Sequence, residues 1–261
     1  MNNVNRTLYI PLWGKAYVSR KGIILHDPKA EEIWAAEGFP LRGRSASKWL
    51  AYYMGMRAAV FDDWVCEQMK RFPESTVIHL GCGLDSRAER VTRGEHLWYD
   101  VDFPAVIQER RRYYEESSTY RMVAADVREE EWLAEIPAGR RAIVVMEGVS
   151  MYLAPEEYRS LCASLRRRCG KISLLVDCYT QLGAKGSKYK NPVHDVGVTK
   201  VYGISNPEEL AKGTGLSFVK EHEMTPQRLV NALQGGEKFL FRHLYGGAIA
   251  GKLYRLYEYE S

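Results

Sequence analysis

The chain of 261 residues has few cysteines and no long apolar run. No stretch reaches the roughly 18 consecutive apolar residues of a membrane helix, and the opening MNNVNRTLYIPLWGK lacks the apolar centre of a signal peptide. The five cysteines form no CxxC pair, and their odd number argues against a disulfide framework. We therefore expect a soluble protein of a reducing compartment, located in the cytoplasm.

Charge of one sign is also scarce. The formal net charge is +4 and is spread along the chain. Two basic triplets, Arg110–Arg112 and Arg166–Arg168, have acidic or polar neighbours, which favours solvated helix faces over a nucleic-acid surface. The six histidines lack the spacing of metal ligands. We expect no nucleic-acid partner, no membrane partner and no metal.

From residue 76 onward, short apolar segments alternate with helix-like segments. This alternation predicts an α/β fold, Rossmann-like and doubly wound, with a mainly parallel sheet. Strands are expected at 76–80, 95–102, 120–126, 141–147 and 171–179, and helices are expected to begin near Ser86, Pro104, Glu129 and Pro155. Segments 216–224 and 252–260 are also strand-like and predict an antiparallel C-terminal edge.

The segment STVIHLGCGLDSRAERV (75–91) predicts a buried strand, a glycine turn and a helix. Gly81 and Gly83 would bring bare backbone close to a ligand. A nicotinamide dinucleotide fits poorly, because Ser86 replaces the third glycine of G-x-G-x-x-G and Asp85 would repel a pyrophosphate. A cationic ligand without phosphate would tolerate Asp85, and S-adenosylmethionine is such a ligand. A nicotinamide-linked oxidoreductase remains the alternative.

Carboxylates follow three of the expected strands, where parallel sheets bind their ligands. Asp102 comes 19 positions after Gly83, close to the spacing at which a nucleoside-binding unit places its ribose ligand. Asp126 and Glu147 end the next two strands. For S-adenosylmethionine, Asp102 is expected to bind the ribose, Asp126 the adenine amino group and Glu147 the methionyl part. Asp100 is the alternative ribose ligand.

Two further parts of the chain lie outside the alternating strands and helices, the N-terminal residues 1–72 and the stretch at about 180–210. Residues 45–72 show the clearest helix pattern, with an apolar face that Arg57 flanks. We expect 1–72 to form an N-terminal helical cap that contributes to the cofactor site, and 73–261 to form the binding core. The polar, glycine-rich stretch at about 180–210 is expected to be a lid-like insertion, although a surface loop has the same composition.

Four segments together resemble the leucine carboxyl methyltransferase family, which includes the tetracenomycin-type polyketide O-methyltransferases. They are VIHLGCGLDSRAERV, WYDVDFPAVIQERR, AADVREEEW and VVMEGVSMYLAPEE. GKAYVSRKGIILHDP and YYMGMRAAVFDDW are similar to the stretches in which this family holds the cofactor carboxylate. The resemblance implies class I S-adenosylmethionine-dependent methyl transfer, with Lys15 and Arg57 as carboxylate ligands. From the residues alone, Arg57 could instead form a surface ion pair with Asp62 or Asp63.

The acceptor is not apparent from these motifs. The family resemblance allows a carboxylate or a phenolic or alcoholic hydroxyl, and a small molecule is favoured over a protein C-terminus. A carboxylate needs no general base, whereas a hydroxyl is helped by one. The histidines available for that role, His194, His222 and His243, are more typical of surface positions, so no catalytic base is assigned. Tyr152 could border the transferred methyl group. A non-catalytic binding module remains a further alternative.

Overall fold

The computed structural model describes residues 5–38, 41, 43–91, 94–190 and 201–261. Its centre is one sheet with the strand order β3-β2-β1-β4-β5-β8-β7, and β6 pairs with the end of β5. The strands are β1 (Thr76–Leu80), β2 (Leu97–Asp102), β3 (Tyr120–Ala124), β4 (Ala142–Met146), β5 (Ile172–Thr180), β6 (Gly203–Ile204), β7 (Ser217–His222) and β8 (Tyr254–Glu260). Strands β1 to β5 pair in parallel, and β8 is antiparallel to β5 and β7. The predicted Rossmann-like sheet with an antiparallel C-terminal edge is confirmed.

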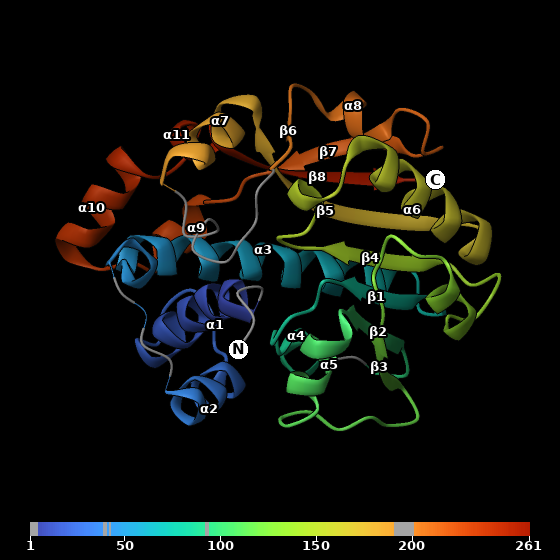
Figure 1. Ribbon diagram of the computed structural model, residues 1–261. Coiled ribbons are helices and arrows are strands. Elements are labelled where there is room, and N and C mark those ends of the chain that lie inside the picture. The colour runs from blue at the N-terminus through green and yellow to red at the C-terminus, as the bar shows by residue number, and fades with distance from the viewer. Residues whose placement is uncertain (1–4, 39–40, 42, 92–93, 191–200) are drawn as a thin grey trace.

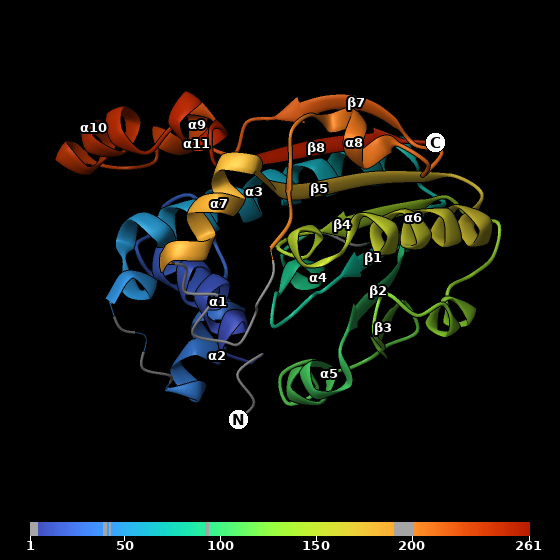
Figure 2. The same cartoon turned by 45° about the horizontal axis from the view of Figure 1, so that its top comes forward.

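Helices cover both faces of this sheet, as Figures 1 and 2 show. The helices are α1 (Asn5–Arg20), α2 (Pro28–Glu37), α3 (Lys48–Arg71), α4 (Arg87–Arg90), α5 (Pro104–Arg110), α6 (Pro155–Cys169), α7 (Gln181–Lys190), α8 (Pro207–Ala211), α9 (Gln227–Val230), α10 (Gly235–Leu244) and α11 (Ala248–Gly251). Short 3-10 turns lie at η1 (Gly43–Ala46), η2 (Glu131–Glu135) and η3 (Ser150–Tyr152). The central strands are fully buried, which explains their nearly continuous apolar sequences.

The alternation of side chains along β4 divides the core into two clusters. Ile143 and Val145 pack in a cluster with the N-terminal helices, whereas Val144 and Met146 pack in a cluster with α6. The first cluster contains residues of α1, α3 and the sheet. The N-terminal helices therefore share one apolar core with the strands.

Helix α3 is the long helix that the sequence predicts at 45–72. It is preceded by η1 and then runs from Lys48 to Arg71. Met56, Val60 and Trp64 of its apolar face are buried. In Figure 1, α1 and α2 lie beyond the end of the sheet toward which the β4 arrow points. This arrangement brings α1 and the start of α3 to the carboxyl ends of the parallel strands.

The helix expected to begin near Ser86 is confirmed, with Ser86 as its N-cap and Arg87–Arg90 as its helical residues. The segment expected to be helical from Glu129 is instead the 3-10 turn η2. The stretch expected to be a lid-like insertion from about residue 180 begins with α7, where the Thr180 hydroxyl accepts a hydrogen bond from the Gly183 amide at 3.0 Å. The N-terminal cap and the backbone hydrogen bonds of α7 thus outweigh the unfavourable helix propensity of its glycines. Residues 191–200 lie outside the described part of the chain.

None of the helices in the described ranges has the length and apolarity to cross a membrane. Nor do the described residues gather three or more histidine, cysteine or acidic side chains that could hold a metal ion.

Candidate active site

The glycine turn after β1 is the innermost part of the site. Gly81 and Gly83 have φ angles of 63° and 54°, in the left-handed region that favours glycine. A Cβ atom on Gly81 would lie 2.2 Å from Val149 Cγ2, and one on Gly83 would lie 3.1 Å from Leu8 Cδ2. Both positions therefore need glycine for two reasons, the backbone conformation and the close approach of a neighbouring side chain.

Asp102, at the tip of β2, lies directly beside this turn. Its Oδ2 accepts a hydrogen bond from the Gly83 amide at 2.8 Å, and its Oδ1 accepts one from the Phe103 amide at 2.7 Å. Burial raises the pKa of the Asp102 carboxyl, although both amides favour its ionised form. In the part of the chain that the structure describes, this carboxylate has no ion pair.

Asp100, two residues earlier, has a different environment. It is fully buried, 2.5 Å from Arg110 Nη2, and it also accepts hydrogen bonds from Tyr120 and Trp98. These contacts occupy Asp100 inside the fold. Within the first basic triplet they correct the expectation for Arg110 alone, which is completely buried, whereas Arg111 and Arg112 are exposed as expected.

Asp126 lies just after β3 and is less buried than Asp102. Its carboxylate is paired with the Arg128 side chain, whose Nε donates to Oδ1 at 2.9 Å. This pairing is the main cause that lowers the pKa of Asp126. Neither Asp102 nor Asp126 lines the main cavity, so the structure does not bring these two expected ligands together with the other site residues there.

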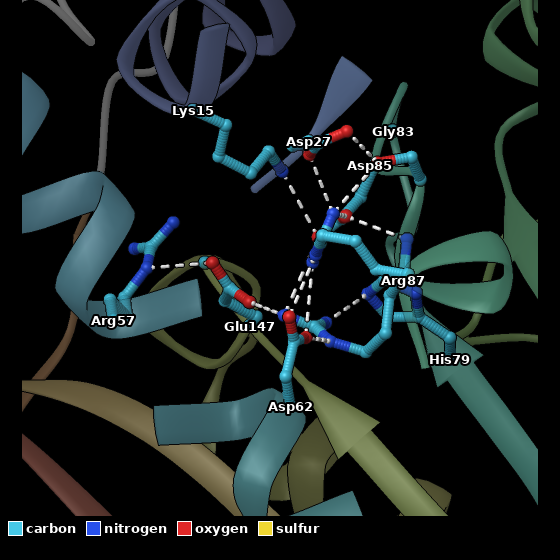
Figure 3. A network of polar contacts seen from close by, with 12 residues as sticks. Lys15, Asp27, Arg57, Asp62, His79, Gly83, Asp85, Arg87 and Glu147 are labelled. Atoms are coloured by element: carbon cyan, nitrogen blue, oxygen red, sulfur yellow. Dashed lines mark hydrogen bonds and ion pairs between the residues drawn. The ribbon is translucent and has the colours of Figure 1, made fainter. Parts of the chain in front are cut away.

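Glu147 and Arg57 meet inside the cavity wall, as Figure 3 shows. Arg57 Nε donates to Glu147 Oε1 at 2.9 Å, and the other oxygen of Glu147 accepts from Arg87. Arg57 Nη1 lies 3.1 Å from Asp177 Oδ2. Burial alone would raise the pKa of Glu147, but Arg87 and Arg57 lower it to about 2. The alternative surface pair of Arg57 with Asp62 or Asp63 is wrong, because Arg57 is buried and bonds to the sheet.

Lys15 reaches the same cavity from α1 (Figure 3). Its Nζ lies 3.0 Å from Asp85 Oδ2, and both side chains are buried. Asp85 also accepts the Arg87 amide at 2.9 Å, and it directly precedes Ser86, the N-cap of helix α4. Burial would raise the pKa of Asp85, but Arg90, Lys15 and Arg87 hold it well below its usual range. The helix entrance is thus occupied by a carboxylate, as the sequence indicated.

The cavity bounded by these groups has a volume of about 760 Å³. The lining residues divide by chemistry into two sets, which the contact between Arg57 and Tyr254 joins. The charged residues and the glycine turn form the first set, with Lys15, Arg57, His79, Gly81, Gly83, Asp85 and Glu147. The second set, which we call the aromatic side, is aromatic and apolar and contains Trp49, Leu50, Tyr53, Met54, Met151, Tyr152, Tyr179, Tyr245, Leu253 and Tyr254. Of the expected site residues, Lys15, Arg57, Gly81, Gly83, Glu147 and Tyr152 therefore line one cavity.

The two described histidines considered as bases, His222 and His243, do not line this cavity. His222 on β7 lies 2.7 Å from Glu258, and His243 bonds to the Phe239 carbonyl within α10. His194 lies outside the described residues. Tyr152 does line the cavity, and burial raises the pKa of its hydroxyl, which therefore stays protonated at neutral pH.

The sequence reasoning missed two groups that bond to Arg57, Asp177 behind the cavity lining and Tyr254 in it. The Tyr254 hydroxyl donates to Asp177 Oδ2 at 2.5 Å and accepts from Arg57 Nη1 at 2.9 Å. Asp177 also accepts the Gly148 amide at 2.7 Å. The sequence does contain a signal for Asp177, an acid near the end of the apolar strand KISLLVDCY, of the same kind as Asp102 and Glu147. Tyr254 has no such signal, because only the antiparallel pairing of β8 with β5 brings it to the site.

Comparison with known proteins identifies the family. Residues 12–166 match the leucine carboxyl methyltransferases. The tetracenomycin polyketide synthesis O-methyltransferase TcmP of Streptomyces glaucescens is 32% identical over 228 residues, which cover 86% of this chain and 84% of that protein. The S-adenosyl-L-methionine-dependent methyltransferase dpfgK of Gibberella zeae is 29% identical over 228 residues, covering 82% of this chain and 73% of that protein.

Solved structures show the same fold at low sequence identity. A putative methyltransferase from Thermobifida fusca has a TM-score of 0.54 at 16% identity and covers 87% of this chain and 92% of its own. Magnesium protoporphyrin IX methyltransferase from Synechocystis with bound S-adenosylhomocysteine has a TM-score of 0.52 at 12% identity and covers 98% of this chain and 99% of its own.

The chain belongs to the leucine carboxyl methyltransferase family. It is an S-adenosylmethionine-dependent methyltransferase, and S-adenosylmethionine is its cofactor. The methyltransferase interpretation of the sequence is thereby confirmed over the nicotinamide-linked one. The residues of the cavity fit this cofactor, since bare glycine backbone, paired cations and carboxylates adjoin a space of suitable size, and Asp85 stands where a pyrophosphate would have to bind.

Proposed function

We propose that the protein transfers the cofactor's methyl group to a hydroxyl oxygen of a small aromatic molecule. The observation that carries this proposal is the aromatic side of the cavity. Trp49 and Tyr245 stack there with ring centroids 5.0 Å apart, and Tyr179 and Tyr254 meet edge to face at 5.1 Å. Aromatic walls of this kind favour planar aromatic ligands. The relative TcmP, an O-methyltransferase of polyketide synthesis, is consistent with such an acceptor.

A carboxylate acceptor, including the C-terminus of a protein, is the second candidate. A carboxylate bound in a cavity needs a cation. Among the described residues, two cations lie against aromatic rings of the cavity, and neither is available to an acceptor. Lys48 lies 4.9 Å from the centroid of the Trp49 ring but pairs with Glu237 at 2.7 Å. Arg57 lies beside Tyr254 but is assigned below to the carboxylate of the cofactor. A neutral hydroxyl therefore suits this side better.

For the cofactor, we propose that Lys15 and Arg57 hold its carboxylate and that Gly81 and Gly83 allow its close approach. The lining of the cavity by all four residues supports this placement. Glu147 would face the methionyl part from its position between two arginines.

The nucleoside part of the cofactor would then lie outside this cavity, next to Gly83, where Asp102 contacts the glycine turn. Asp102 would bind the ribose hydroxyls, and its position beside the Gly83 amide supports this role. Asp126 would bind the adenine amino group, for which it has to share its oxygens with Arg128. Bound hydroxyls would be charge-assisted donors to Asp102.

The chemistry needs alignment more than acid–base groups. Methyl transfer from a sulfonium is an in-line displacement with a good leaving group, so positioning and the exclusion of water supply most of the acceleration. Tyr152 would border the methyl group from the aromatic side. No side chain is assigned as general base.

We further propose that residues 1–72 act as a cap that completes the cofactor site and that the segment at about 180–210 acts as a lid. The positions of Lys15 and Arg57 on α1 and α3 support the first part, and those of Tyr179 and Leu253 beside α7 support the second. The free thiols support a cytoplasmic location.

Steady-state kinetics with three acceptor series tests the proposed reaction, namely planar phenols, aliphatic alcohols and peptides with a free C-terminal carboxylate. We expect kcat/KM to be highest for the phenols. Trp49→Ala should raise the KM for a phenol and leave the Kd for the cofactor unchanged, with exposed Phe239→Ala on α10 as the control for loss of an aromatic ring. Preferential turnover of the peptides would contradict the proposal.

A further inference from the structure

The charged side of the cavity belongs to a closed network of ion pairs. Its cations are Lys15, Arg57, Arg87 and Arg90, and its carboxylates are Asp27, Asp62, Asp85, Glu147 and Asp177. Every one of these side chains is at most 13% exposed, so solvent screens the network weakly. Figure 3 shows how the network passes from Arg57 through Glu147 and Arg87 to Asp85 and Lys15.

Among the described residues, the charges of this network do not balance. With His79, which lies 3.2 Å from Arg87, counted as neutral, four cations face five carboxylates, which leaves one negative charge. The neighbouring pair Asp100–Arg110 is neutral in sum, and Asp102 adds a further carboxylate. The buried surroundings of the cofactor site therefore carry an excess of negative charge, which is costly without a compensating cation.

The unmatched carboxylate can be placed at Asp177. Lys15 is paired with Asp85 and Arg57 bonds Glu147 through Nε, whereas Asp177 shares the Nη1 of that same arginine. Its other contacts are donors without charge, the Gly148 amide and the Tyr254 hydroxyl. Burial raises the pKa of Asp177, and these three donors counter the rise because all of them bond the ionised form.

S-adenosylmethionine and its product differ by one charge. In both, the amino-acid part contributes one ammonium and one carboxylate, which cancel. Loss of the methyl group converts the positive sulfonium into a neutral thioether. Only the methyl donor, therefore, carries the net positive charge that the network lacks.

We propose that Asp177 and its network select the sulfonium over the thioether, so that S-adenosylmethionine binds more tightly than S-adenosylhomocysteine and the product leaves readily. Asp177 acts here as a positioning residue through Arg57 and Tyr254, since it does not line the cavity itself. The inference rests on the proposed placement of the cofactor in this cavity and is independent of the acceptor.

Calorimetry on the full chain without acceptor tests this proposal. We expect the Kd for S-adenosylhomocysteine to exceed that for S-adenosylmethionine by a factor on the order of tenfold, as one unit charge near a buried counter-charge provides. Sinefungin, in which an amine-bearing carbon replaces the sulfonium, should bind like the methyl donor. Because the network is buried, this ratio should change little with added salt.

Asp177→Asn should reduce the ratio of the Kd for S-adenosylhomocysteine to that for S-adenosylmethionine toward one. If Asp177→Asn does not fold, Asp62→Asn removes the same charge from the network at a position farther from the cavity. Asp63→Asn is the matched control, since Asp63 is exposed on the same helix as Asp62 and pairs with Arg228 outside the network. Equal Kd values for the two ligands in the wild type would overturn the proposal. So would an equal loss for both ligands in Asp177→Asn, which would make Asp177 purely structural. A failure of the phenol series alone would leave these results untouched.

Discussion

Arg57 is the residue at which the helix pattern, the family motif and the observed contacts meet. The pattern predicts a cation beside an apolar face, and the structure buries that cation between Glu147 and Asp177. A buried arginine with two carboxylates has a structural function in addition to any function toward the cofactor.

Arg57→Met is therefore expected to have two separate effects. It should weaken S-adenosylmethionine binding and leave 5′-methylthioadenosine, which lacks the amino-acid part, nearly unaffected. It should also lower the free energy of unfolding by about 3–5 kcal/mol, because buried Asp177 loses its cationic partner and Glu147 keeps only Arg87. Calorimetry with both ligands and urea unfolding measure the two effects. Equal losses for both ligands would show that Arg57 does not touch the cofactor.

Substitutions at Asp102 and Asp100 should have different effects, one on the affinity for the cofactor and the other on the stability of the fold. Asp102→Ala is expected to cost about 1.5–3 kcal/mol of cofactor affinity, the range of hydrogen bonds to a charged group. Asp100→Ala should instead destabilise the fold, since Arg110 would remain buried without its carboxylate. Titration calorimetry and thermal unfolding of both variants distinguish these effects. A greater loss of affinity in Asp100→Ala at unchanged stability would move the ribose site to Asp100.

The Asp100–Arg110 pair should also make the free energy of unfolding depend on pH in the acidic range. Burial raises the pKa of Asp100, but Arg110 and hydrogen bonds from His79 and Tyr120 outweigh it and lower the pKa to about 2 from its usual 3.8. A lowered folded-state pKa stabilises the fold above the unfolded pKa, and this stabilisation is lost as the pH falls through about 2. The wild type should exceed Asp100→Asn in unfolding free energy above pH 4 or so, and the two should converge toward pH 2. Denaturant unfolding across this range measures the difference, and a constant difference would contradict the assignment.

At the scale of elements, the glycine turn is the most restricted part of the site. Gly81→Ala meets both a φ of 63° and a side chain 2.2 Å from the new Cβ. Gly139→Ala is the matched control, with a φ of 72° and open space around the Cβ. We expect Gly139→Ala to cost about 1 kcal/mol of stability, and Gly81→Ala to cost more and to abolish cofactor binding. Equal behaviour of the two variants in calorimetry and unfolding would show that the approach of Val149 is unimportant.

Elements with strong periodicity were predictable, and those fixed by distant contacts were not. The strands of the parallel sheet and α3 follow from apolar runs and helical spacing in the sequence. Helix α7 did not, because glycines at 183 and 186 oppose a helix locally, whereas the cap by Thr180 supports one. Helix α10 lies at the periphery in Figure 2 and is held to α3 by Glu237, which pairs with Lys48 at 2.7 Å. A pairing across 189 residues leaves no local signal.

At the scale of the whole molecule, the cofactor side of the cavity was largely predictable from the sequence and the acceptor side was not. Gly81, Gly83 and Glu147 follow strand ends, where sheet topology requires ligands to bind. Tyr152 is the one aromatic residue of the cavity proposed from the sequence. Tyr254 and Tyr245 come from the C-terminal part of the chain. Tyr254 reaches the cavity because β8 pairs with β5, and Tyr245, at the end of α10, because it stacks on Trp49 of α3.

The central claim is that this chain methylates a phenolic oxygen inside the aromatic side of the cavity. The most direct measurement uses one planar acceptor that carries both a phenolic hydroxyl and a carboxylate, together with S-adenosylmethionine labelled at its methyl group. Treatment of the product with mild base distinguishes the two sites, since a methyl ester is hydrolysed and a methyl ether is not. We predict that the label stays on the aromatic product after this treatment, and its release as methanol would contradict the account.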